Sequence, residues 1–313
     1  MSGGFERNYY GVKQPAGFPG LPDGWYTEWE TRVAADGKTK LFALVHQKKN
    51  TPVKNVLVLV HGFSEHSGRY LHFPHFLDAS HAGIDALYSY DQRGHGRSEG
   101  LRGDAESFDA LADDLAGIVR HVETKFPGAG VHLYGHSLGG HVALRLGFLH
   151  EGLPLKTFQV SAPYLALFKE PALPLKMAAS LLSKTWSTLS LGTDVDASVL
   201  SRDERVVENY GADRLNHGRM TPRFYTSMSA AQRDTLHRTS GFHYPLAVHL
   251  PLADGLVKSA TTREFYDRLE NPLGKQLFEY RDFRHEPGNE IGKEQFFENL
   301  SGVLSGKIIE GAK

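Results

Sequence analysis

A serine stands at a tight corner between an apolar strand and a helix in VHLYGHSLGGHVALRLG, residues 131–147. The apolar residues before the corner alternate as in a short strand, and those after it have the spacing of a helix face. Glycines at positions 135, 139 and 140 surround Ser137, where a Cβ atom would crowd the strand or the helix. Such a turn holds the serine hydroxyl out of the sheet, beside the free N–H groups of a helix N-terminus. In this context the pattern G-x-S-x-G predicts a nucleophile on an α/β fold.

Apolar strands alternate with helical segments along most of the chain. The run VKNVLVLV (53–60) is apolar almost throughout, which is typical of a strand covered on both faces. Further strands are expected at KLFALVHQ (40–47), GIDALYSYD (83–91), VHLYG (131–135), KTFQVSA (156–162), LAVHLPLAD (246–254) and KQLFEYRDF (275–283). Residues 107–126 have the apolar spacing of a helix, with Ser107 as the expected N-cap. This alternation predicts a doubly wound α/β fold, with a mostly parallel central sheet flanked by helices.

One part of the chain breaks the alternation. From about residue 164 to 240, strand signals fade and helical ones dominate. Its apolar stretch YLALFKEPALPLKMAASLLSKTW (164–186) is interrupted by prolines and charged residues, so we expect an inserted helical cap rather than a membrane span. The expected division is an irregular N-terminal arm at 1–26, rich in Gly, Pro and Tyr, then a core at 27–163, the cap at 164–240, and the rest of the core at 241–313.

Composition excludes several classes of protein. The 313 residues contain no cysteine, which excludes a disulfide scaffold, a thiol nucleophile and a cysteine metal site. Lys and Arg number 35 against 36 Asp and Glu, and this near-zero net charge argues against a nucleic-acid partner. No secretory leader and no run of about 18 apolar residues is visible. The sequence therefore predicts a soluble, cytoplasmic protein.

A serine nucleophile needs a base, and the base needs an orienting acid. In the α/β-hydrolase arrangement the three follow in the order Ser, Asp or Glu, His. After Ser137, Asp254 ends an expected strand, although an Asp-Gly turn would also explain it. His285 follows the last expected strand and is chosen for that position, since any of the 17 histidines could be a surface or core residue. The sequence thus predicts Ser137, Asp254 and His285 as a catalytic triad.

The negative oxygen that forms during ester cleavage needs two N–H donors. One donor is expected at Leu138, directly after the nucleophile. The other is expected from the loop after an early strand, where His61-Gly62 turns the chain and presents the N–H of Phe63. A plain turn is the alternative explanation of His61-Gly62.

Four segments resemble the monoacylglycerol lipase and lysophospholipase branch of the α/β-hydrolases, within the serine aminopeptidase-type hydrolases. They are HGFSEHSGRY (61–70), YDQRGHGRSEG (90–100), GHSLGG (135–140) and LSRDERVVENYGADRLNHGRMTPRFYT (200–226). The resemblance extends from about residue 27 to 300 and implies the same triad and the same oxyanion donors. It also implies that Glu65, Arg69 and Tyr210 lie near the glycerol end of the substrate. A loop salt bridge and a cap-packing tyrosine are the alternatives for these three.

The chain departs from this family pattern at two positions. Pro251 stands where the family usually has a glycine, three places before the acid, and is expected to stiffen the approach to Asp254. Gly288 stands three places after His285, where members with monoglyceride activity can carry a polar contact residue. The glycerol end is therefore expected to be looser in this chain.

Together these features predict a serine hydrolase that cleaves carboxylic esters of single-chain lipids, such as monoacylglycerols or lysophospholipids, through an acyl-enzyme on Ser137. No cofactor and no metal is expected. An acyl pocket is expected from the apolar cap residues Leu165, Leu167, Phe168, Leu173, Leu175 and Met177. Packing between cap helices is the alternative use for several of them. The cap is also a candidate for transient contact with a membrane surface.

Two other functions use the same fold. A serine aminopeptidase or amidase would share the triad, but it would require a cluster of carboxylates to bind a free amino terminus. Glu65 is the one candidate carboxylate that the sequence places near the site. A non-catalytic ligand-binding protein should have lost at least one triad residue, and none is lost here. Oligomeric state does not follow from the sequence.

Overall fold

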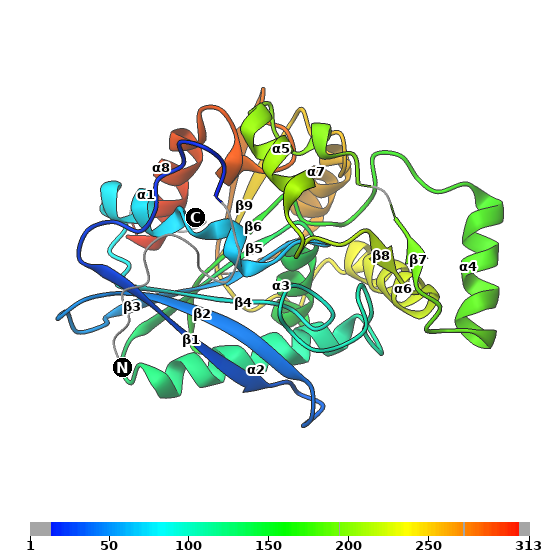
Figure 1. Ribbon diagram of the computed structural model, residues 1–313, viewed down its shortest axis with the longest axis horizontal. Helices are drawn as coiled ribbons and strands as arrows, with labels where there is room; N and C mark the ends of the chain where they lie inside the picture. Colours follow the sequence, from blue (N-terminus) through cyan, green and yellow to red (C-terminus); the bar gives the residue numbers. More distant parts are fainter. Residues whose placement is uncertain (1–13, 194, 272, 307–313) are drawn as a thin grey trace.

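An eight-stranded sheet with helices on both faces forms the centre of the computed structural model, which describes residues 14–193, 195–271 and 273–306 (Figure 1). The strand order is β1-β2-β4-β3-β5-β6-β9-β10, and of these strands β2 runs antiparallel to both of its neighbours. The strands are β1 (Trp25–Val33), β2 (Lys40–Lys48), β3 (Asn55–Val60), β4 (Ala86–Tyr90), β5 (Gly130–His136), β6 (Leu155–Ser161), β9 (Leu246–Pro251) and β10 (Lys275–Tyr280). The α/β-hydrolase fold expected from the sequence is confirmed.

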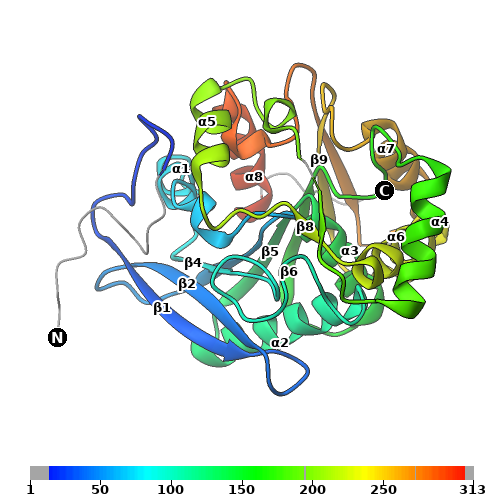
Figure 2. The ribbon, with the colours of Figure 1, turned by 45° about the vertical axis from the view of Figure 1, so that its right-hand side comes forward.

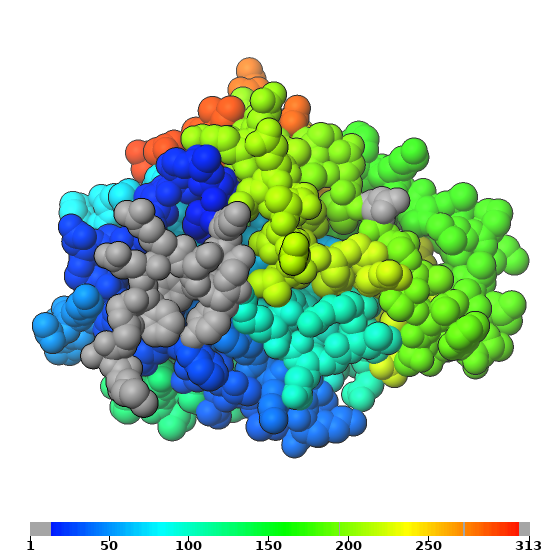
Figure 3. All heavy atoms as spheres, viewed as in Figure 1, coloured from blue at the N-terminus to red at the C-terminus, as the bar shows by residue number. Residues whose placement is uncertain are grey.

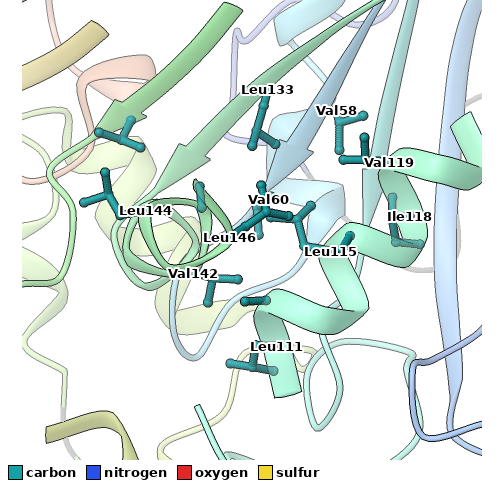
Figure 4. Close-up of a cluster of buried hydrophobic side chains, with 14 of the residues drawn as sticks. Val58, Val60, Leu111, Leu115, Ile118, Val119, Leu133, Val142, Leu144 and Leu146 are labelled. Carbon is teal, nitrogen blue, oxygen red and sulfur yellow. The ribbon is translucent and has the colours of Figure 1, made fainter. Parts of the chain in front are cut away.

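The central strand β3 is buried on both faces because its apolar side chains alternate between two cores. The helices around the sheet are α1 (Phe73–Ala79), α2 (Asp109–Lys125), α3 (Leu138–Leu149), α7 (Ser259–Arg268) and α8 (Lys293–Leu304). Val58 and Val60 point into a core shared with α2 and α3 (Figure 4), whereas Leu57 and Leu59 point into a core shared with α1 and α8. Helix α2 has Phe108 rather than the expected Ser107 at its N-cap position, but Ser107 Oγ still accepts a hydrogen bond from the N–H of Ala110 at 3.1 Å.

The segment between β6 and β9 is largely helical. It contains α4 (Leu173–Thr185), β7 (Leu191–Gly192), α5 (Glu204–Ala212), β8 (Arg219–Met220) and α6 (Pro222–His237). Helix α4 packs against α6 and lies at one edge of the molecule, coloured green in Figures 1–3. Of the residues in α4, Ala179 alone is buried.

Backbone hydrogen bonds tie this inserted segment to two loops of the core. The N–H of Phe168 donates to the carbonyl oxygen of Leu256 at 2.9 Å, just past the predicted acid. The N–H of Glu286, just past the predicted base, donates to the carbonyl oxygen of Leu200 at 2.9 Å. The inserted segment therefore contacts the loop of the predicted acid and the loop of the predicted base.

The sequence did not predict β1. This edge strand pairs with β2 alone and leaves Trp29 and Val33 exposed, and its sequence WYTEWETRV lacks the apolar run that identified the other strands. It begins at Trp25, inside the expected arm of residues 1–26, and residues 1–13 of that arm lie outside the described part of the chain.

Among the residues that the structure describes, no helix combines the length and the hydrophobicity that crossing a membrane requires.

Candidate functional site

Ser137 occupies the sharp corner between β5 and α3. Its backbone has φ 53° and ψ −117°, a conformation that a residue with a side chain rarely adopts. The corner is fixed because the N–H of Ser137 donates to Ser161 at 2.9 Å, and its carbonyl oxygen accepts from the N–H groups of His141 at 3.0 Å and Tyr164 at 2.9 Å. The Oγ atom is therefore presented by rigid elements at the carboxyl end of the sheet.

The glycines on either side permit this corner. A Cβ atom on Gly135 would lie 2.4 Å from the carbonyl oxygen of Gly139, and one on Gly139 would lie 2.3 Å from that of Val60. Both distances are too short for non-bonded atoms, so the steric explanation given for these glycines agrees with the structure.

The structure brings Ser137, Asp254 and His285 together. His285 Nε2 lies 2.9 Å from Ser137 Oγ, and His285 Nδ1 lies 2.7 Å from Asp254 Oδ2. All three side chains are buried. These distances suit proton transfer from the serine to the histidine.

Electrostatics at His285 favour its protonated form more than usual. Burial lowers the pKa of His285, but the charge of Asp254 and the hydrogen bond to it more than offset this effect, with smaller contributions from Glu286 and Glu65. The pKa of His285 therefore lies above its ordinary value. A carboxylate placed in this way also stabilises the imidazolium that forms when the serine loses its proton.

Pro251 does not displace the acid. It ends β9, and its carbonyl oxygen accepts a hydrogen bond from the hydroxyl of Ser259 at 2.5 Å. Beyond it, Asp254 Oδ1 accepts from the N–H groups of Leu256 at 2.7 Å and Val257 at 2.9 Å. The acid is thus oriented by its own loop.

The two predicted oxyanion donors lie beside the serine. Leu138 begins α3, and a Cβ atom on Gly62 would lie only 3.2 Å from Ser137 Cβ, which places the Gly62–Phe63 peptide against the nucleophile. Neither the N–H of Leu138 nor that of Phe63 has an acceptor among the residues that the structure describes. Both are available to a developing negative oxygen.

A cavity of about 520 Å³ opens at Ser137. Its polar end is formed by Glu65, Arg69, Tyr210 and Glu286, from the early loops, α5 and the base loop. Its other end is mostly apolar and is lined by Leu167, Leu175, Ala179, Leu191, Val195, Met220, Tyr225 and Met228. One end thus suits a hydroxylated group and the other a hydrocarbon chain.

The polar end is an ion-pair cluster. Arg69 Nη1 donates to Glu65 and, at 2.7 Å, to Glu286, while Arg69 Nη2 donates to Glu286 at 2.9 Å. The ring of Tyr210 covers the guanidinium at 4.9 Å. Glu65 also accepts hydrogen bonds from the N–H of Gly62 at 2.5 Å and from a neighbouring tyrosine hydroxyl, so it braces the loop while facing the cavity.

Glu286 is the residue at this end that the sequence analysis missed. Burial raises the pKa values of Glu65 and Glu286, but the charge of Arg69, hydrogen bonds and smaller charge effects together outweigh it and hold both below their usual range. An acidic residue directly after the predicted base was the available signal. Gly288, by contrast, does not line the cavity, because it packs against the ring of Phe73. The expected loosening of the glycerol end at Gly288 is therefore not seen.

The expected acyl pocket is partly wrong. Leu167 and Leu175 line the cavity, but Leu165 is buried in the main core. Phe168, Leu173 and Met177 do not line the cavity and are 65–69% exposed, although Leu175 is itself 60% exposed. Leu173 and Met177 lie on the same face of α4 because they are four residues apart, whereas Leu175 points elsewhere.

Within the described residues, no group of three histidine, aspartate or glutamate side chains is arranged to hold a metal ion.

Comparisons with known proteins identify the family of this chain. Residues 51–292 match the family model described as "Serine aminopeptidase, S33". The chain belongs to this family of α/β-hydrolases. It is 34% identical over 192 residues to the monoglyceride lipase of Homo sapiens, a match that covers 61% of each protein. It is 29% identical over 266 residues to an abhydrolase domain-containing protein of Dictyostelium discoideum, covering 85% of this chain but 27% of that protein.

A solved structure extends the similarity. The crystal structure of a monoacylglycerol lipase from Paleococcus ferrophilus has a TM-score of 0.74 and 25% identity, and covers 85% of this chain and 99% of its own. The family resemblance stated from the sequence is confirmed. The chain is thus an α/β-hydrolase family member related to monoglyceride lipases, and it spans less than two thirds of the two sequence relatives named above.

Proposed function

We propose that this protein is a serine carboxylic-ester hydrolase that acts on single-chain lipid esters, such as monoacylglycerols or lysophospholipids. The observation that carries the proposal is the hydrogen-bonded series from Asp254 through His285 to Ser137, at a cavity with one polar and one apolar end. The relationship to monoglyceride lipases supports the choice of substrate.

The reaction proceeds through an acyl-enzyme. Ser137 Oγ attacks the ester carbonyl carbon while His285 Nε2 accepts the serine proton, and the N–H groups of Phe63 and Leu138 bind the negative oxygen. The carbon–oxygen bond to the alcohol then breaks, and His285 gives its proton to the leaving oxygen. Water repeats the sequence and releases the fatty acid. Asp254 holds the imidazole in the required tautomer throughout.

The two ends of the cavity divide the substrate between them. The acyl chain lies at the apolar end formed by α4, α6 and β7, where each buried methylene contributes up to about 0.8 kcal/mol. Glu65, Arg69 and Tyr210 face the leaving alcohol at the polar end. A triacylglycerol would bring further acyl chains to this polar end, so single-chain esters fit better.

Aminopeptidase activity is the competing function. It would need carboxylates on the acyl side of the scissile bond, where a free α-amino group lies. Glu65 and Glu286 instead lie at the polar end, where both are paired with Arg69. Glu170 at the other end is paired with Lys176 at 2.7 Å. This placement favours the ester hydrolase.

The outer face of α4 suits contact with a lipid surface. Leu173, Met177 and Leu181, spaced four residues apart, are 64–69% exposed. Such a stripe on a helix next to the apolar end would bring the cavity to the interface where lipid esters lie.

A substrate panel tests the proposal. Nitrophenyl esters of rising chain length are compared with a monoacylglycerol, a triacylglycerol and an aminoacyl anilide. We expect kcat/KM to rise from acetyl to octanoyl, with clear monoacylglycerol cleavage and little cleavage of the triacylglycerol or the anilide. Preference for acetyl over octanoyl esters, or faster cleavage of the anilide, would contradict the proposal.

A further inference from the structure

The polar end of the cavity has two carboxylates for one guanidinium. Glu65, Arg69 and Glu286 are each at least nine-tenths buried and line the cavity. Arg69 directs Nη1 at both glutamates and Nη2 at Glu286, so these donors are turned toward the protein's own carboxylates. With both glutamates ionised, the cluster carries a net charge of about −1 in a place with little water to screen it.

The neighbouring groups do not offset this charge, and the adjacent His285 already has a carboxylate partner in Asp254 at 2.7 Å. Burial raises the pKa of Tyr210 to about 12 and lowers the pKa of His136 to about 4, so both are neutral at pH 7. Lys169 and Glu170 also line the cavity, but they directly precede α4 at the opposite end, and Glu170 is paired with Lys176 at 2.7 Å. Figure 1 shows this separation, with α5 near the centre and α4 at the far edge.

The leaving alcohol must occupy this polar end. His285 Nε2 delivers a proton to the leaving oxygen, so the alcohol lies next to His285. The following residue is Glu286, whose side chain lines the same part of the cavity. The leaving group is therefore the part of the substrate that experiences the charge of the cluster.

We propose that Glu286 is a specificity-determining residue that makes the enzyme select esters of neutral or cationic alcohols and reject esters of phosphorylated, anionic alcohols. This inference rests on the proposed function and narrows its substrate class. Glu65 and Arg69 alone would form a neutral pair, and Glu286 adds the excess negative charge.

The first experiment compares two substrates that differ in one phosphate, 1-octanoylglycerol and 1-octanoylglycerol 3-phosphate. For the wild type we expect kcat/KM to favour the neutral ester by about tenfold or more. In Glu286→Gln the ratio should fall about tenfold, because one negative charge is removed near the leaving group. A ratio within one variant is insensitive to a general loss of activity.

Glu290→Gln is the matched control. Glu290 is a buried carboxylate of the same loop, paired with Arg202 at 3.2 Å, and it does not line the cavity. The ratio of kcat/KM for the neutral ester to that for the phosphorylated ester should be the same in Glu290→Gln as in the wild type. An unchanged ratio in Glu286→Gln, or an equal change in Glu290→Gln, would overturn the inference.

A second comparison needs only the wild-type protein. Octanoylcholine and 3,3-dimethylbutyl octanoate have leaving alcohols of the same shape and differ in one positive charge. We expect the choline ester to be cleaved several-fold faster. Equal rates, or slower cleavage of the choline ester, would overturn the inference while leaving the ester hydrolase intact. Failure to cleave any of the four esters would overturn the proposed function and this inference with it.

Discussion

His61 Nδ1 lies 2.7 Å from the carbonyl oxygen of Gly62. His61 Nε2 accepts a hydrogen bond from the N–H of Gln92 at 2.9 Å, so the ring proton resides on Nδ1 and is donated to Gly62. Burial lowers the pKa of His61, which keeps the ring in this neutral form. The carbonyl and N–H of one peptide point in opposite directions. Holding the oxygen of Gly62 therefore fixes the direction of the N–H of Phe63, the proposed oxyanion donor.

We predict that His61→Ala lowers kcat about 100-fold with little change in KM, because a misdirected donor is lost mainly in the transition state. His61→Asn should recover part of the loss, since its amide can donate to the oxygen of Gly62. Steady-state kinetics on nitrophenyl octanoate measures both, and thermal unfolding verifies folding. If folded His61→Asn is no better than His61→Ala, His61 does not position the loop.

The pH dependence should reflect the raised pKa of His285. A protonated imidazole cannot accept the serine proton, so activity is full above this pKa and is lost as pH falls through it. Because the pKa is raised, half of the activity should be lost at a pH above the ordinary histidine value of 6.5. A kcat/KM profile that stays flat down to pH 5 would contradict His285 as the base.

The acid can be tested against a neighbouring aspartate. Asp254→Asn should lower kcat by about 10⁴-fold, because the wrong imidazole tautomer is then held toward Ser137. Asp282, which is exposed two residues beyond β10, is the control, and Asp282→Asn should remain near wild-type activity. Similar losses in the two variants would show that the acid is misassigned.

Acyl-chain preference should depend on Ala179. This residue of α4 lines the apolar end of the cavity, and Ala179→Phe would fill space that a long chain needs. We expect kcat/KM for octanoyl esters to fall at least tenfold while acetyl ester turnover changes little. Each methylene that is no longer buried loses up to about 0.8 kcal/mol of binding free energy. Equal effects on both esters would place the acyl chain elsewhere.

The exposed stripe on α4 should govern binding to lipid vesicles. Replacing Leu173, Met177 and Leu181 by serine together should reduce co-sedimentation with phosphatidylcholine vesicles about tenfold or more, because their apolar area is then lost. Val33→Ser is the control, because Val33 is 60% exposed and belongs to β1, which lies far from α4. This variant should bind vesicles as the wild type does. Unchanged binding of the triple variant would exclude α4 as the contact.

The sequence predicted the features of the site that depend on the order of strands and loops along the chain. Asp254 and His285 were found because each follows a particular strand, and strand order fixes where the following loop lies. Side-chain direction inside the cap was not predictable in this way. Leu173 and Leu175 look alike in sequence and both are largely exposed, yet of the two Leu175 alone lines the cavity. Which face of α4 is covered depends on its packing against α6, and no local pattern encodes that contact.

The role of Glu286 also could not be predicted from the sequence. A glutamate beside a histidine in a loop is ordinarily a solvated charge. Its pairing with Arg69 spans 217 positions in sequence and arises only when the base loop folds over the early loops. Charge clusters built from distant loops in this way need the folded chain to be recognised.

The central claim is that Ser137 carries a covalent acyl intermediate, and active-site labelling tests it most directly. The protein is treated with a fluorophosphonate probe, digested, and mapped by mass spectrometry. We predict a single modification, on Ser137, together with complete loss of esterase activity, and no modification of Ser137→Ala, whose kcat should be lower by 10⁴-fold or more. Modification of another serine that abolishes activity, or near-normal turnover by Ser137→Ala, would contradict the account.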